Sequence, residues 1–110
     1  MYKEQKSHYY QIDHDGFLIN YRNWSENVAR TIAKIEELEL NERHWELIYL
    51  IRQYYLEFQH APTMRSLVNW TKLNLGEQKG TSGYLYFLFP KSPPKQLCRI
   101  AGLPKPKNCF

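Results

Sequence analysis

The stretch that decides the fold is NERHWELIYLIRQYYLEFQHAPTMRSLVNWTKLNLG, residues 41–76. Asn41, at its start, is a residue type that often caps the beginning of a helix. In the first half, apolar side chains recur at the spacing of one face of an α-helix. These side chains are Trp45, Ile48, Ile51, Tyr55 and Phe58. The pattern predicts a long amphipathic helix that begins after Asn41.

The second half of the stretch predicts another helix. Pro62 ends the first one, because a residue that precedes proline is disfavoured in the α region, and proline also suits the first turn of a following helix. Gly76 stands where glycine often closes a helix. Between these two residues the apolar side chains keep a helical spacing: Met64, Leu67, Val68 and Leu73.

Two helices joined by the short turn HAPT, residues 60–63, resemble a helix-turn-helix. In that motif the second helix reads DNA, and basic side chains supply much of the affinity. Residues 64–75 offer Arg65 and Lys72 and are otherwise apolar or neutral. We therefore expect no direct DNA binding.

The sequence before residue 41 predicts one helix and, before it, a hairpin. Residues 24–38 carry apolar side chains at helical spacing, with Asn23 or Ser25 available as N-cap. Before them, the dipeptide Asp15-Gly16 is flanked by apolar residues, which is a hairpin signal. The sequence thus predicts a hairpin followed by an amphipathic helix.

Toward the C-terminus two short helices are predicted. The first covers the aromatic segment 82–89, and the second covers residues 95–101, opened by Pro93-Pro94 and ended by Gly102. The remaining residues, LPKPKNCF, contain two prolines and no periodicity. We expect them to form an extended, solvated arm.

These elements place the protein in the α+β class. We expect a small N-terminal β hairpin or meander packed against an array of about five helices. The length of 110 residues, with 43% hydrophobic residues and three tryptophans, fits one folded domain. No internal repeat or long linker divides the chain. Residues 1–110 are therefore predicted as a single domain, of which 102–110 form the mobile arm.

Several function classes are excluded by composition. No apolar run reaches the roughly 18 residues that cross a bilayer. The first residues, MYKEQKSHYY, lack the features of a secretory signal, so a cytoplasmic location is expected. The four histidines and two cysteines show no metal-ligand spacing, and no phosphate-binding loop or catalytic motif is present. We expect no metal, no cofactor and no self-contained active site.

Charge is concentrated at the C-terminal end. The first ninety residues hold ten basic and eleven acidic side chains, whereas residues 91–110 hold five basic ones and no acid. A basic segment on a nearly neutral body suggests an acidic partner, either a protein surface or RNA phosphate. The alternative is a tail that only aids solubility. The five basic residues are Lys91, Lys95, Arg99, Lys105 and Lys107.

Cys109, next to last in the sequence, is the main candidate for chemistry. It lies on the predicted arm, where it has little core to enter and is accessible to other proteins. A thiolate is the nucleophile that takes sulfur from a donor persulfide, and a mobile arm carries the product between active sites. The sequence therefore predicts sulfur transfer at Cys109.

Cys98 has two interpretations. If residues 101–103 form a turn, the arm can fold back so that Cys109 meets Cys98, which would then act as a resolving cysteine through a reversible disulfide. In the other interpretation, Cys98 is a small apolar helix residue beside Leu97 and Ile100.

Several motifs resemble those of the DsrC/TusE family of sulfur-carrier proteins. They are AGLPKP at 101–106 and the penultimate Cys109, preceded by DGFL at 15–18, HW at 44–45, YY at 54–55, AP at 61–62, GEQKG at 76–80, YLY at 84–86 and LFP at 88–90. The resemblance covers nearly the whole chain. It implies a small β meander against an array of helices, a mobile C-terminal arm, and a sulfurtransferase that acts only as a covalent carrier, with Cys109 as persulfide acceptor.

The resemblance also implies partners, which differ between two branches. In the TusE branch, a complex such as TusBCD supplies the sulfur and a thiouridylase such as MnmA uses it to thiolate the wobble uridine of tRNA. In the DsrC branch, two arm cysteines exchange sulfur with dissimilatory sulfite reductase. Residues 24–26 and 55–58 resemble the first branch, and Cys98 resembles the second. We expect the tRNA relay, with Arg99, Lys105 and Lys107 guiding the arm.

Overall fold

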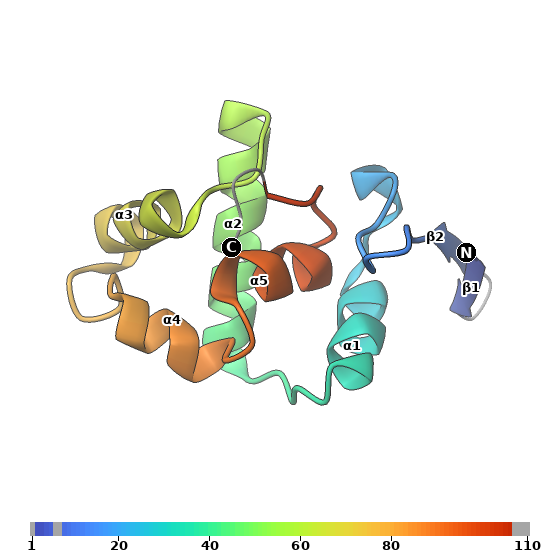
Figure 1. Cartoon of the computed structure of the whole chain (residues 1–110), viewed down its shortest axis with the longest axis horizontal. Helices are drawn as coiled ribbons and strands as arrows, with labels where there is room; N and C mark the ends of the chain where they lie inside the picture. Colours follow the sequence, from blue (N-terminus) through green and yellow to red (C-terminus); the bar gives the residue numbers. More distant parts are fainter. Residues whose placement is uncertain (1, 6–7, 107–110) are drawn as a thin grey trace.

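The computed structural model describes residues 2–5 and 8–106 of the chain (Figure 1). Two short strands come first, and all the remaining regular structure is helical. The strands are β1 (Tyr2–Gln5) and β2 (His8–Gln11). The helices are the 3-10 helix η1 (Tyr21–Asn23), α1 (Glu26–Ile35), α2 (Glu42–Phe58), α3 (Met64–Leu75), α4 (Ser82–Leu88) and α5 (Pro93–Ala101). This arrangement confirms the predicted α+β class with its helical array.

Side-chain caps set where the helices begin. Ser25 Oγ accepts from the Val28 N–H at 3.2 Å, which selects Ser25 from the two predicted caps of α1. Asn41 caps α2 as predicted, and His44 Nδ1 accepts from the Asn41 N–H in return, which completes a capping box. Thr63 Oγ1 caps α3 by accepting from the Ser66 N–H at 3.2 Å. Local sequence thus determines most helix starts.

Helix α5 is the centre of the molecule. It contacts each of α1, α2, α3 and α4, and Figure 1 shows it in front of α2, with α1 on one side and α3 and α4 on the other. Four of its apolar side chains are fully buried: Leu97, Cys98, Ile100 and Ala101. The helix begins at Pro93, two residues earlier than predicted, because the two prolines form its first turn. None of the helices among the described residues has the length and apolarity to cross a membrane.

The predicted hairpin around Asp15-Gly16 is reduced to a tight turn. Its only β-type pairing is the isolated bridge between Ile12 and Leu18, whereas the two-stranded antiparallel sheet, β1 with β2, lies earlier in the chain. Asp13 explains the difference. Its carboxylate accepts from the N–H groups of Asp15 and Phe17, so these donors stay within the turn.

Three residues predicted on buried helix faces lie instead at exposed positions. Ile35 is 62% exposed, Phe58 is 43% exposed and Leu73 is 77% exposed. Ile35 and Phe58 are the last residues of α1 and α2, and Leu73 is in the last turn of α3. Helical periodicity places these side chains on the correct face but does not show where the neighbouring element stops covering that face.

Candidate functional site

The predicted site residues belong to the C-terminal segment. Cys109 and Lys107 lie outside the described residues, so their predicted roles stay predictions. Cys98 and Arg99 are in α5, and Lys105 follows that helix. The end of α5 is therefore the part of the structure that leads to Cys109.

Gly102 closes α5 in a left-handed conformation, with φ of +74°. Its N–H donates to the Arg99 carbonyl, and the next N–H, of Leu103, donates to the Cys98 carbonyl at 2.9 Å. A Cβ atom at position 102 would lie 2.5 Å from Cδ1 of Trp24, so the close contact requires glycine. Leu103 is fully buried. Positions 102 and 103, predicted as part of the arm, thus belong to the packed body. Pro104 and Lys105 are exposed, and Pro106, the last residue described, is buried again.

Two side chains from elsewhere in the chain hold this helix end. The Trp24 indole Nε1–H donates to the Ile100 carbonyl at 2.8 Å, and Arg52 Nη1–H donates to the Ala101 carbonyl at 2.6 Å. The Arg52 guanidinium also lies over the Trp24 ring, 4.1 Å from its centroid. Burial lowers the pKa of Arg52 below its usual value. We call Trp24 and Arg52, with the two carbonyls they bind, the Trp24–Arg52 clamp.

Sequence reasoning missed this clamp. Helical spacing predicts Trp24 on a helix face, whereas it lies between η1 and α1. The position of Arg52 in the sequence does indicate a buried role. It follows Trp45 and Ile48 at spacings of seven and four, so it shares the apolar face of α2. A cation on a buried face points to a specific acceptor, but the sequence does not identify it.

The Cys98 side chain is buried, with no exposed surface, in the same core as Leu97 and Ile100. Its position agrees with the interpretation as a core residue. Its side chain is therefore not accessible to solvent. The resolving role remains a proposal.

The basic side chains of this region bind acids of the body. Arg99 Nε–H donates to Glu36 Oε2 at 2.6 Å, and the two side chains are 21% and 12% exposed. Lys105 Nζ–H donates to Asp15 Oδ2 at 3.3 Å, and this hydrogen bond lowers the pKa of the Asp15 carboxyl. The charge of Arg99 is thus offset inside the protein, whereas the Lys105 pair is half exposed.

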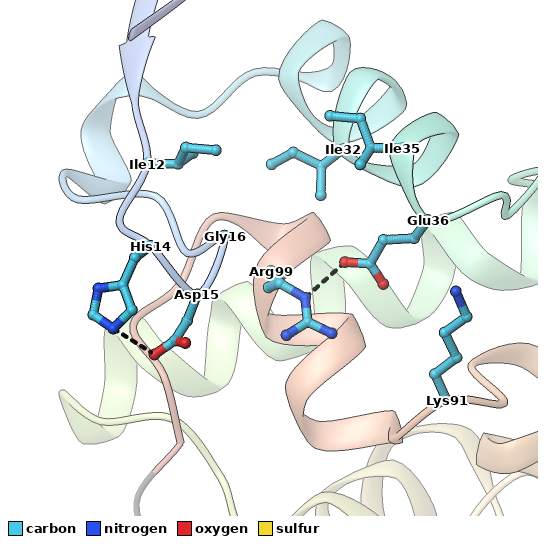
Figure 2. A pocket seen from close by; sticks show the side chains of 9 residues that line it. All are labelled: Ile12, His14, Asp15, Gly16, Ile32, Ile35, Glu36, Lys91 and Arg99. Atoms are coloured by element: carbon cyan, nitrogen blue, oxygen red, sulfur yellow. Dashed lines mark hydrogen bonds and ion pairs between the residues drawn. The ribbon is translucent and has the colours of Figure 1, made fainter. Parts of the chain in front are cut away.

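A cleft of about 380 Å³ lies beside these ion pairs, between the 13–17 turn, α1 and α5 (Figure 2). Isoleucines form its apolar part, and Figure 2 shows Arg99 directed across it to Glu36, with Lys91 beside that pair. The lining residues are Ile12, His14, Asp15, Gly16, Ile32, Ile35, Glu36, Lys91 and Arg99. The region described contains no group of three His, Cys, Asp or Glu side chains that could hold a metal ion.

The comparisons with known proteins agree with this geometry. The family model described as "DsrC like protein" matches residues 4–110. A sulfurtransferase TusE from Photorhabdus laumondii is 50% identical over 100 residues, which cover 91% of this chain and 90% of that protein.

Two solved structures share the fold. The DsrC of Allochromatium vinosum has a TM-score of 0.90 and 45% identity, and the oxidized gamma-subunit of the dissimilatory sulfite reductase from Archaeoglobus fulgidus has a TM-score of 0.85 and 38% identity. Each comparison covers 100% of both chains. The resemblance found in the motifs is confirmed, and the chain belongs to the DsrC-like protein family.

Proposed function

We propose that this protein is a sulfur-relay protein that accepts sulfur as a persulfide on Cys109 and passes it toward 2-thiolation of the tRNA wobble uridine. The observation that carries the proposal is the 50% identity to a sulfurtransferase TusE over 91% of the chain. The match to the family model extends to residue 110 and so includes Cys109.

The reaction is a transfer of one sulfur atom between two thiols. The Cys109 thiolate attacks the outer sulfur of a donor persulfide, the sulfur–sulfur bond of the donor breaks, and the donor thiolate leaves. Cys109 then carries the outer sulfur as a persulfide. The acceptor thiolate repeats the same displacement and regenerates the Cys109 thiolate, so no external oxidant or reductant is needed.

The burial of Cys98 supports the assignment of this role to Cys109. A nucleophile must meet the donor sulfur directly, and the Cys98 side chain has no exposed surface. Loading at Cys98 would first require the core around α5 to open. We therefore place the carrier function on Cys109.

The partners in this proposal are a donor complex like TusBCD and a thiouridylase like MnmA with its tRNA, all in the cytoplasm. Lys105 and Lys107 would favour docking on an acidic surface or near tRNA phosphate. Arg99 would contribute less than these lysines, because Glu36 already offsets its charge at 2.6 Å.

The test is the intact mass of the protein after exposure to a persulfide donor. The reduced wild type, Cys98→Ser and Cys109→Ser are compared, and peptide mapping locates any added sulfur. We expect the mass of one added sulfur atom in the wild type and in Cys98→Ser, on the C-terminal peptide, and none in Cys109→Ser. Loading that persists in Cys109→Ser would overturn the proposal.

A second candidate function is that of a sulfur carrier for dissimilatory sulfite reductase, which would use both cysteines. Two observations favour it: the presence of Cys98 in α5, and the 38% identity to the Archaeoglobus fulgidus chain named as the gamma-subunit of that enzyme. The Cys98→Ser variant separates the candidates. A tRNA relay continues without Cys98, whereas a two-cysteine cycle stops.

A further inference from the structure

We infer that Trp24 and Arg52 are positioning residues for sulfur transfer, because they fix the end of α5 and hence the point from which the chain leads to Cys109. This inference rests on the proposed function. Neither side chain takes part in the chemistry. Their role is to keep the chain that carries the thiol at a constant origin and direction relative to the body of the protein.

The clamp joins three parts of the fold that are distant in sequence. Trp24 precedes α1, Arg52 is in α2, and the carbonyls of Ile100 and Ala101 end α5. The last carbonyls of a helix lack partners within the helix, and a positive charge near them is favourable. The clamp supplies a donor to each of two such carbonyls and places a guanidinium beside the helix end.

Arg52 differs from two other arginines of the protein in having no carboxylate partner. Arg99 pairs with Glu36, and Arg30 pairs with Glu26. Arg52 forms no ion pair within the described part of the chain, and its contacts are the Ala101 carbonyl and the Trp24 ring. The electronegative end of α5 and the face of the Trp24 ring take the place of a carboxylate for this partly buried cation. Arg52 is therefore committed to holding the end of α5.

Holding this end matters because of the length of chain beyond it. Pro106, the last residue that the structure describes, is buried, and Cys109 stands three residues further on, so the thiol can reach at most about 10 Å from the last packed position. If the segment from 101 to 106 detached with the helix end, the tether would lengthen about threefold. The effective concentration of a tethered group falls as about the −3/2 power of tether length, which is about a fivefold loss. Loss of the exit direction adds to this loss.

The structure offers matched variants for a test. Trp24→Phe keeps an aromatic ring but removes the indole N–H that binds Ile100, and Arg52→Gln removes the cation. Trp45→Phe and Arg30→Gln are the controls, since Arg30 lies over the Trp45 ring at 5.3 Å and neither residue touches the end of α5. Arg52→Lys keeps a cation that can reach the Ala101 carbonyl.

The first measurement reports on the helix end without any relay partner. In a Cys109→Ser background, the rate at which a thiol reagent modifies Cys98 measures how often the end of α5 opens. We expect Trp24→Phe and Arg52→Gln to raise this rate about fivefold, since each loses one hydrogen bond, and the controls to leave it unchanged. An unchanged rate in both clamp variants would overturn the inference, whatever the function of the protein.

The second measurement is sulfur transfer from Cys109-persulfide protein to a TusE-dependent thiouridylase with its tRNA. The clamp variants keep the basic side chains of the arm but let the end of α5 open more often. We therefore expect kcat to fall, by no more than the roughly fivefold loss of a fully detached end, with KM unchanged, and Arg52→Lys to recover most of the rate. Faster Cys98 modification with unchanged kcat would reduce the clamp to a structural role and overturn the inference. Failure of the proposed function is seen separately, as absence of sulfur loading in the unsubstituted protein.

Discussion

The ends of α2 and α5 adopt the same backbone conformation but are held in different ways. Both helices stop at a left-handed residue, Gln59 with φ of +62° and Gly102 with φ of +74°. Gln59 closes α2 locally, through its own side chain bound to the Leu56 carbonyl. The end of α5 is instead bound by Trp24 and Arg52, from distant parts of the chain.

The two helix ends also differ in how far the leucine beside each is exposed to solvent. Beside the end of α2, Leu56 is 60% exposed, whereas Leu103, just after α5, has no exposed surface. Of these two helix ends, the one that leads to Cys109 in the sequence is the one held by long-range hydrogen bonds. The end of α2, which connects to α3, is closed by its own residues.

The largest expected effect is that of Gly102→Ala. Alanine at this position combines a positive φ with a Cβ 2.5 Å from Trp24, so we expect the free energy of unfolding to fall by about 3 kcal/mol. Chemical denaturation measures it. Gly83→Ala is the control, because its Cβ would meet only Thr81 Oγ1 at 4.0 Å, and we expect no loss. A loss as large in Gly83→Ala would show that close contact is not the cause.

The contrasting variant is Gln59→Gly at the end of α2. Glycine relieves the positive φ but removes the side-chain hydrogen bond to Leu56, so the two effects offset each other to within about 1 kcal/mol. The same denaturation experiment measures the difference. A destabilisation comparable to that of Gly102→Ala would contradict the distinction between a locally closed end and an anchored one.

An intermediate effect is expected for the ion pair that joins α5 to α1. Glu36→Gln leaves the partly buried Arg99 without its carboxylate partner, and we expect a loss of about 2 kcal/mol in the free energy of unfolding. The double variant with Arg99→Gln should lose less than the sum of the two single variants, because the unpaired charge is gone. Additive losses would show that the two side chains act independently.

The start of α2 is expected to make stability depend on pH. His44 Nδ1 accepts from the Asn41 N–H while Nε2–H donates to the Leu88 carbonyl at 2.9 Å, so the ring is neutral in the folded protein. Burial lowers the pKa of His44 below its ordinary value of 6.5. The unfolded chain therefore binds the proton more readily, and this stabilisation is complete above pH 6.5 and lost as the pH falls below it.

Denaturation midpoints measured between about pH 8 and about pH 5 test this dependence, because histidine ordinarily titrates within that interval. His44→Gln is the comparison variant, because it removes the titrating ring. We expect its stability to depend less on pH than that of the wild type over this interval. Equal slopes for the two proteins would exclude His44 as the source.

The smallest effect is expected at the exposed pair of Lys105 and Asp15. Both side chains are about half exposed, so Asp15→Asn should leave the unfolding midpoint nearly unchanged. Thermal denaturation at low and high salt measures it. A loss as large as that of Glu36→Gln would mean that the segment after Leu103 is held as firmly as the end of α5.

The elements that could be predicted from sequence are those determined by neighbouring residues. Asn41 as the cap of α2, Gly76 at the end of α3 and Gly102 at the end of α5 are all confirmed. Each depends on a hydrogen bond or a backbone conformation within a few residues. The family was predicted equally well, because its motifs are contiguous stretches of sequence.

The contacts that could not be predicted join distant residues. Trp24 binds a carbonyl 76 positions away and Arg52 binds one 49 positions away, and helical periodicity contains no information about such pairs. The sequence does not decide the burial of Cys98 for the same reason, since the core around it includes residues of other helices. The roles of Cys109 and Lys107 stay predictions that rest on the sequence and on the family.

The central claim is that Cys109 alone carries sulfur to the acceptor. The direct test is formation of 2-thiouridine in tRNA when sulfur-loaded protein is the only sulfur source for the thiouridylase, with the wild type, Cys98→Ser and Cys109→Ser compared. We predict thiolated tRNA with the wild type and with Cys98→Ser, and none with Cys109→Ser. Thiolation supported by Cys109→Ser, or lost in Cys98→Ser, would contradict the account.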